Sequence, residues 1–94
     1  MFNVQVALAV NPNSLAALKS VYKDTFVHAI STQPGFVAVD LLQSCKDDEA
    51  CLLVIVFENR DLQQKWVATE LHQQVWPQIE ACCTGYKVHA FQAI

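Results

Sequence analysis

The sequence has little glycine and no motif suited to binding a phosphate group. Gly35 and Gly85 are the only two glycines among its 94 residues. A loop that cradles a nucleotide phosphate needs several glycines close together. None of the serines stands in a recognisable nucleophile context either. Nucleotide or flavin binding through such a loop, and a serine catalytic triad, are therefore not expected.

Positive charge and long apolar runs are also scarce. The six Lys and Arg residues are scattered and the net charge is −3, whereas a nucleic-acid-binding surface needs clustered basic residues. No run approaches the roughly 20 apolar residues of a membrane span, and the first residues follow a strand pattern without a basic leader. We expect a soluble cytoplasmic protein with neither a nucleic-acid partner nor a membrane partner.

The four cysteines show no Cys-x-x-Cys motif and no Cys/His spacing suited to zinc. We therefore expect no metal site. Cys45 and Cys51 flank the tip of a predicted hairpin, where they could face each other at a bridgeable distance. A disulfide and a pair of half-buried thiols both remain open, although a reducing cytosol disfavours the disulfide.

The composition predicts a partner chain. A chain of this length forms one domain, residues 1–94. Apolar residues make up 53% of it and charged residues 16%, against about 45–50% and about 25% in ordinary domains. The apolar surplus predicts that a second copy covers part of the surface, as in a homodimer.

The first half of the chain changes from a strand pattern to a helix pattern and back. Apolar and polar residues alternate over 2–10, which is typical of a strand. Residues 11–14 interrupt this pattern and offer helix caps. Apolar residues then recur every three or four positions up to about Ile30. The turn 33–35 ends this helix, and residues 36–43 are predicted to form the second strand.

The third predicted strand, 52–57, is apolar throughout. A strand without alternation must be covered on both faces. The few helices of this chain can cover only one face of the sheet. The other face is therefore expected to meet a second sheet, which a second copy of the chain would supply.

Two helical segments and a last strand complete the chain. A helix around Trp66 is followed by a segment from 71 to 83, which Pro77 either kinks or restarts. Gly85 is expected just beyond its end, and residues 86–91 form the last strand. The order β-α-β-β-α(α)-β predicts a ferredoxin-like α+β fold with an antiparallel four-stranded sheet.

One stretch carries a family resemblance. The turn Gln33-Pro34-Gly35-Phe36 is followed by a hairpin, an amphipathic helix with Trp66, and His72 six residues later. This order resembles the antibiotic biosynthesis monooxygenase family of dimeric α+β barrels, over nearly the whole chain. The resemblance implies a homodimer with two sheets packed face to face and a pocket between each sheet and its own helices. Members include cofactor-independent oxygenases, haem-degrading enzymes and isomerases.

The haem-degrading branch of this family does not fit the sequence. It uses an Asn on the first strand facing the helices, a Trp on the second helix, and a His about ten residues later. Trp66 fits, but Trp76 stands ten residues further on and cannot ligate iron. The helix-facing position of the first strand falls near Val6, and Asn3 has the opposite parity. Haem degradation is therefore not expected.

His72 is the candidate catalytic residue. It shares a helical face with Trp76 and Ile79, which places an imidazole among apolar groups. With an ordinary pKa near 6.5 it could take a proton from a phenol or quinol. The resemblance implies that such a substrate anion passes an electron to dioxygen without a cofactor. The alternative is a structural histidine bonded to a backbone carbonyl.

Five further residues are candidates for substrate binding. Trp66 and Trp76 could stack on a flat aromatic ligand, or could fill the core. Tyr22 could direct its hydroxyl into a pocket, or pack with its oxygen at the rim. Asn59 could hold a ligand oxygen, or cap a helix. His28 follows an aspartate by one helical turn, which could orient its ring, although a solvent-facing pair is the alternative.

The resulting functional prediction is a monooxygenase that needs no metal or organic cofactor. Its substrate would be a small aromatic, quinol or polyketide-like molecule, with His72 as base. One alternative is a small-metabolite isomerase in which His72 shuttles a proton in the same pocket. Others are a non-catalytic ligand-binding or stress-associated dimer, and a regulatory module of the ACT type with the same topology. Fold resemblance alone does not decide among them.

Overall fold

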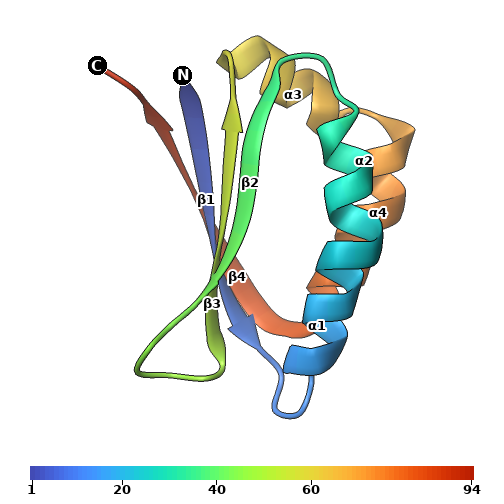
Figure 1. The fold of residues 1–94 in the computed structure, drawn as a ribbon, viewed down its shortest axis with the longest axis vertical. Coiled ribbons are helices and arrows are strands. Elements are labelled where there is room, and N and C mark those ends of the chain that lie inside the picture. Colours follow the sequence, from blue (N-terminus) through green and yellow to red (C-terminus); the bar gives the residue numbers. More distant parts are fainter.

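The computed structural model describes residues 1–94, which form one four-stranded sheet covered on one face by helices (Figure 1). The strands are β1 (Phe2–Val10), β2 (Phe36–Gln43), β3 (Ala50–Phe57) and β4 (Cys83–Gln92). The helices are α1 (Leu15–Val21), η1 (Tyr22–Phe26), α2 (Val27–Ser31), α3 (Arg60–Val67) and α4 (Glu70–Glu80). No helix is long and apolar enough to span a membrane.

The strand order is β2-β3-β1-β4, and each neighbouring pair is antiparallel. β1 and β3 therefore lie in the middle of the sheet, and β2 and β4 form its two edges. This arrangement confirms the predicted ferredoxin-like α+β fold.

The first predicted helix is confirmed, and it contains a π-helical turn. α1, η1 and α2 follow one another without a gap from Leu15 to Ser31. Tyr22 and Phe26 stand at the two ends of η1, with their ring centroids 6.4 Å apart and an interplanar angle of 23°. A π turn shifts the side chains that follow it relative to a regular α-helix. Phe26, the last residue of this turn, and Ile30 beyond it are both buried.

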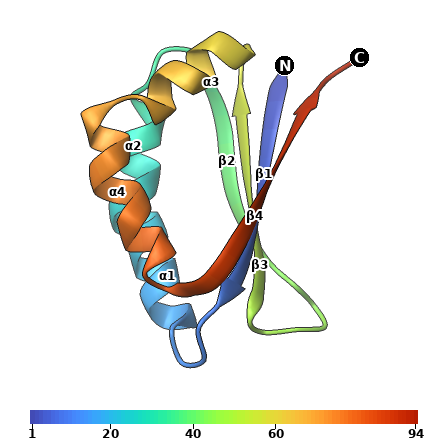
Figure 2. The same ribbon diagram turned by 180° about the vertical axis from the view of Figure 1, so that it is seen from behind.

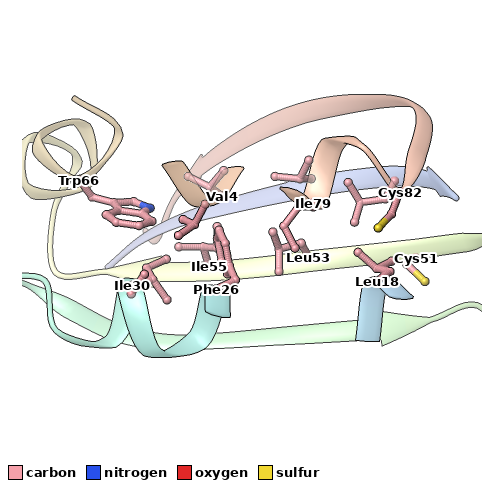
Figure 3. Packing of buried hydrophobic residues seen from close by; sticks show 14 of the residues in the cluster. Val4, Leu18, Phe26, Ile30, Cys51, Leu53, Ile55, Trp66, Ile79 and Cys82 are labelled. Atoms are coloured by element: carbon pink, nitrogen blue, oxygen red, sulfur yellow. The ribbon is translucent and has the colours of Figure 1, made fainter. Parts of the chain in front are cut away.

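The core lies between the sheet and the helices, and all 17 of its buried residues are apolar. Alternation in β1 places Val4 and Val6 in this core, on the helix-facing side. Figure 3 shows Trp66 at one end of the packed side chains, with Cys51 and Cys82 at the other. Full burial of a large apolar side chain stabilises the fold by about 1.5–3 kcal/mol.

The face of the sheet opposite the helices is apolar but uncovered in the single chain. Burial alternates along β3, so that Leu52, Val54 and Val56 lie half-exposed on this face. Leu42 of β2 and Phe91 of β4 are 51% and 53% exposed. Figure 2 shows that no helix lies on this side, where the β2–β3 loop projects. Cover by a second copy stays a prediction.

One local prediction is wrong, and two alternatives that the sequence left open are decided. Gly85 does not follow a helix end, because α4 stops at Glu80 and Gly85 pairs with Ala9 inside β4. Of the two alternatives for Pro77, a kink or a restart of the helix, the restart is excluded, because α4 runs through Pro77 without a break. The two cysteines of the hairpin do not face each other across it. Gln43 pairs with Cys51, while Cys45 is an exposed free thiol in the loop.

Candidate functional site

A cavity of about 240 Å³ lies between helices α3 and α4, η1 and the sheet. Nine of its eleven lining residues are apolar or aromatic. They are contributed as follows: Gln63, Trp66 and Val67 by α3; His72 and Trp76 by α4; Phe26 by η1; and Val4, Val6, Ile55, Tyr86 and Val88 by the sheet. Tyr86 and Val88 belong to edge strand β4 and are exposed. The cavity therefore has an apolar interior and an exposed wall at the β4 edge.

Two side-chain caps fix the helices that carry the site. Asn59 Oδ1 accepts a hydrogen bond from the Leu62 amide at 2.9 Å and begins α3. Thr69 Oγ1 accepts one from the His72 amide at 3.1 Å and begins α4. The Thr69 hydroxyl also donates to the Trp66 carbonyl at 2.7 Å. One threonine thus ties the backbone of Trp66 to that of His72.

The His72 ring lies between two indoles. The edge of one ring meets the face of the other for Trp66 and His72, with centroids 5.0 Å apart and an interplanar angle of 84°. Trp76 stacks on the imidazole at 6.3 Å and 15°. Trp76 in turn meets Tyr86 edge-on at 5.2 Å, close to the β4 wall. These contacts restrict the orientation of the imidazole before any ligand binds.

His72 has an unsatisfied polar atom. Its Nδ1 is buried and has no hydrogen-bond partner. The bond to a backbone carbonyl that a purely structural histidine would make is therefore not present at this atom. Burial lowers the pKa of His72 below its ordinary value of 6.5. The ring is thus neutral at neutral pH, which is the form that can accept a proton.

The structure brings three of the six predicted site residues together: His72, Trp66 and Trp76. Trp66 is also 2% exposed and part of the core. The alternative prediction, that Trp66 fills the core, is therefore confirmed as well, since the same side chain packs in the core and lines the cavity.

The other three predicted residues lie outside this cavity. Asn59 is exposed and caps α3, and His28 is exposed on α2. Tyr22 lines a different cavity, and its hydroxyl donates to the Val39 carbonyl at 3.3 Å. Burial raises the pKa of Tyr22, and the negative charge of Asp40 adds to this effect. A ligand role for these three residues stays a prediction.

Sequence reasoning missed Gln63 and the β4 contribution. Gln63 supplies an amide to a largely apolar wall, and it precedes Trp66 by three residues on the same helix. That spacing, which places both side chains on one face, was the available signal. Tyr86 and Val88 could not be placed in the cavity from sequence, since their position depends on how β4 pairs with β1.

The expected position on strand one is confirmed by its register. Val6 faces the helices and lines the cavity, while Asn3 lies on the opposite face of the sheet. The Asn and His positions of the haem-degrading pattern are therefore occupied by Val6 and Trp76. No group of three or more His, Cys, Asp or Glu side chains is placed to hold a metal ion.

Comparison with known families and structures gives one consistent result. The model of the antibiotic biosynthesis monooxygenase family matches residues 1–77. SnoaB, a cofactor-independent oxygenase from Streptomyces nogalater, is 22% identical with a TM-score of 0.88, and the match covers 99% of this chain and 92% of SnoaB. Another structure, of an antibiotic biosynthesis monooxygenase, is 21% identical with a TM-score of 0.84, over 100% and 99% of the two chains.

The same fold occurs at lower identity. A conserved protein from Methanosarcina mazei Go1 is 10% identical with a TM-score of 0.86, over 97% of this chain and 90% of that one. Comparison with curated protein sequences gives no match. Identities this low establish a shared fold and leave the chemistry to be argued from the cavity itself.

Proposed function

The chain belongs to the antibiotic biosynthesis monooxygenase family, and on that premise we propose that it is a cofactor-independent monooxygenase. Its substrate is a small aromatic, quinol or polyketide-like molecule, bound in the cavity between α3, α4 and the sheet. The observation that carries the proposal is His72, a neutral imidazole held between two indoles in an apolar cavity. SnoaB, which has the same fold, is a cofactor-independent oxygenase.

The cavity walls favour a flat apolar substrate. Trp66, Trp76 and Phe26 offer aromatic surfaces, and the sheet supplies branched aliphatic side chains below them. Aromatic faces bind flat rings by offset stacking or edge contacts. Gln63 supplies an amide that can bond a phenol or carbonyl oxygen and so orient the ring. This combination of an apolar volume with few polar groups is typical of small-molecule sites.

The proposed reaction begins with proton transfer to His72. The neutral imidazole takes a proton from an activated phenol or benzylic CH₂ of the substrate, and leaves a delocalised anion. The anion gives one electron to dioxygen, and the two radicals combine into a peroxide at carbon. His72 returns its proton to the peroxide, which loses water and leaves a carbonyl. A CH₂ group thus becomes C=O, one oxygen atom leaves as water, and the substrate supplies every electron.

The surrounding groups support this use of His72. An imidazolium would bear an N–H at Nδ1 with no acceptor in a buried site, so the neutral ring is favoured before substrate binds. The apolar interior of the cavity limits the contact of water with the substrate anion and the peroxide. The bond from Thr69 to the His72 amide holds the first turn of α4 in place. His72 acts as the base, and Trp66 and Trp76 act as stacking walls.

We further propose that the protein is a cytoplasmic homodimer. The half-exposed Leu52, Val54 and Val56, with the exposed Leu42 and Phe91, form an apolar face with no cover in the single chain. A second copy packed on this face would bury it, and monomers rarely leave large apolar patches exposed. All four cysteines are free thiols, which suits a reducing compartment.

The experiment that tests the proposed function is oxygen consumption by chelator-treated protein. Dihydroxynaphthalenes and polyketide-like anthrones serve as substrates. The parent chain is expected to consume oxygen, and His72→Ala to lose about 10²–10⁴-fold of the rate. His72→Phe keeps an aromatic ring between the indoles but has no base, so it should lose as much. Gln74→Ala, at an exposed position of the same helix, is the matched control and should retain the parental rate.

Each other outcome points to a different function. Proton exchange into the substrate without oxygen uptake would indicate an isomerase with His72 as the shuttle. Binding of these aromatics with neither uptake nor exchange would indicate a ligand-binding protein. Equal uptake by the parent chain and both His72 variants would remove His72 as the base.

A further inference from the structure

A second cavity, of about 210 Å³, lies on the helix-covered side of the sheet at its β2 edge. Its lining residues come from the first helical segment and from the facing strands. They are Leu15, Lys19, Tyr22, Lys23, Leu41, Gln43 and Cys51. None of them lines the cavity that contains His72. Figure 3 places Cys51, which lines the second cavity, at the end of the core opposite Trp66, which lines the first.

The lining of this second cavity is cationic and holds no carboxylate. Lys19 and Lys23 are four residues apart in one helical segment, which places both ammonium groups over the same side of it. Lys19 lies close enough to act on the Cys51 thiol, whose pKa burial raises and the lysine charge lowers. Asp40, the acidic group that acts on Tyr22, belongs by its pairing with Val54 to the opposite face of the sheet.

The interior of the second cavity is apolar. Leu15 and Leu41 are half-buried and pack against the core, and Cys51 is buried beside them. Tyr22 adds a ring wall, and its hydroxyl is already bonded to a backbone carbonyl. Two ammonium groups therefore lie beside an apolar pocket that offers few other polar contacts.

We propose that this cavity binds a small amphipathic carboxylate. Lys19 and Lys23 hold the carboxylate, and the apolar tail lies against Leu15, Leu41 and Cys51. Two ammonium groups without a carboxylate in the cavity attract an anion, and charge-assisted hydrogen bonds to a carboxylate are stronger than neutral ones. The apolar walls add the free energy of burying the tail. This site is separate from the one that contains His72 and does not depend on the oxygenase proposal.

The test is an NMR titration of the ¹⁵N-labelled protein with hexanoate. The amide signals of Leu15, Tyr22 and Leu41 are expected to shift and saturate, while that of His72 stays in place. Acetate, which has no tail, and hexanol, which has no charge, are each expected to bind at least about tenfold more weakly. Added salt should weaken the binding of hexanoate and leave that of hexanol unchanged.

Variants of the two lysines test whether their charge binds the carboxylate without changing the fold. Lys19→Gln with Lys23→Gln should weaken hexanoate about tenfold and leave hexanol unchanged. Both lysines are exposed and glutamine is a good helix former, so the fold is retained. Arg60→Gln with Lys65→Gln makes the same change in net charge on α3, which contributes no residue to this cavity, and should bind hexanoate like the parent chain.

Three results would overturn the proposal. The first is the absence of saturable shifts up to about 10 mM hexanoate. Binding would then be weaker than about 3 kcal/mol. The second is an equal affinity of the parent chain and the Lys19→Gln, Lys23→Gln variant. The third is a set of shifts confined to the first cavity, around His72 and Trp66. Oxygen uptake measured without hexanoate reports on the first cavity alone, so the two proposals fail separately.

Discussion

Replacing Gly35 with alanine tests how the turn before β2 positions the helix that carries Trp66. Gly35 has φ +80°, a conformation that side-chain-bearing residues rarely adopt. An added Cβ would overlap Leu62 Cδ1 and lie 2.9 Å from Leu62 Cβ. Leu62 precedes Trp66 by one turn of α3. The close approach of the Gly35 backbone to Leu62 therefore helps to set the distance between α3 and the sheet.

The cost of this substitution has two parts. The left-handed backbone conformation costs an alanine about 1–2 kcal/mol. Forcing a methyl group against Leu62 adds about 1–3 kcal/mol of overpacking. The sum, about 2–5 kcal/mol, is a large share of the 5–15 kcal/mol that typically stabilises a domain. Gly85→Ala is the matched control, since its Cβ meets nothing within 4 Å. We expect Gly85→Ala to stay within about 0.5 kcal/mol of the parent chain.

The assay is urea unfolding at one protein concentration, followed by tryptophan fluorescence, because Trp66 is 2% exposed in the folded chain. The midpoint for Gly35→Ala should fall sharply, and the Gly85→Ala midpoint should not. A loss below about 0.5 kcal/mol for Gly35→Ala would contradict this prediction, since it would show that neither the turn nor the Leu62 contact resists a methyl group. Equal losses in both variants would assign the effect to alanine in general.

Three further predictions concern the candidate site. Because burial lowers the pKa of His72 below 6.5, the unfolded chain binds this proton more readily than the folded one. The free energy of unfolding should therefore fall as the pH drops below about 6.5, until the pKa of the folded state is passed, and His72→Phe should remove this part of the pH profile. Asn59→Ala should lower the free energy of unfolding in urea by about 0.5–2 kcal/mol through loss of the α3 cap. The KM for an aromatic substrate should stay unchanged, and a raised KM would instead assign Asn59 a ligand role. Trp66→Ala should cost about 3–5 kcal/mol of stability, whereas Trp76→Ala, at a half-buried position, should cost less and mainly raise the KM; equal losses would contradict this division.

The elements of this fold were predictable because their hydrophobic periods are clear. Alternation in β1 placed Val4 and Val6 toward the helices, and the spacing of His72 and Trp76 placed both on one face of α4. Each inference uses residues close together in the chain, where the geometry of a strand or helix fixes the direction of a side chain. The choice between a capping and a binding role for Asn59 needed the hydrogen bond to Leu62.

The cavity was only partly predictable, because its walls come from distant parts of the chain. Tyr86 reaches it through the pairing of β4 with β1, a register that no local pattern specifies. The same pairing draws Gly85 into the strand, although a glycine near a helix end is typical of a cap. Tyr22 and Phe26 lie on one helical stripe, yet they line different cavities, a division that their spacing along the helix does not indicate.

Isotope transfer from ¹⁸O₂ to an anthrone substrate by chelator-treated protein would show directly whether this chain is a cofactor-independent monooxygenase. We expect one labelled oxygen atom in each product molecule, the other atom in water, and no labelled product from His72→Phe beyond the uncatalysed background. Oxygen in the product that derives from water, a reaction that stops when metal is removed, or equal labelling by His72→Phe would contradict this expectation.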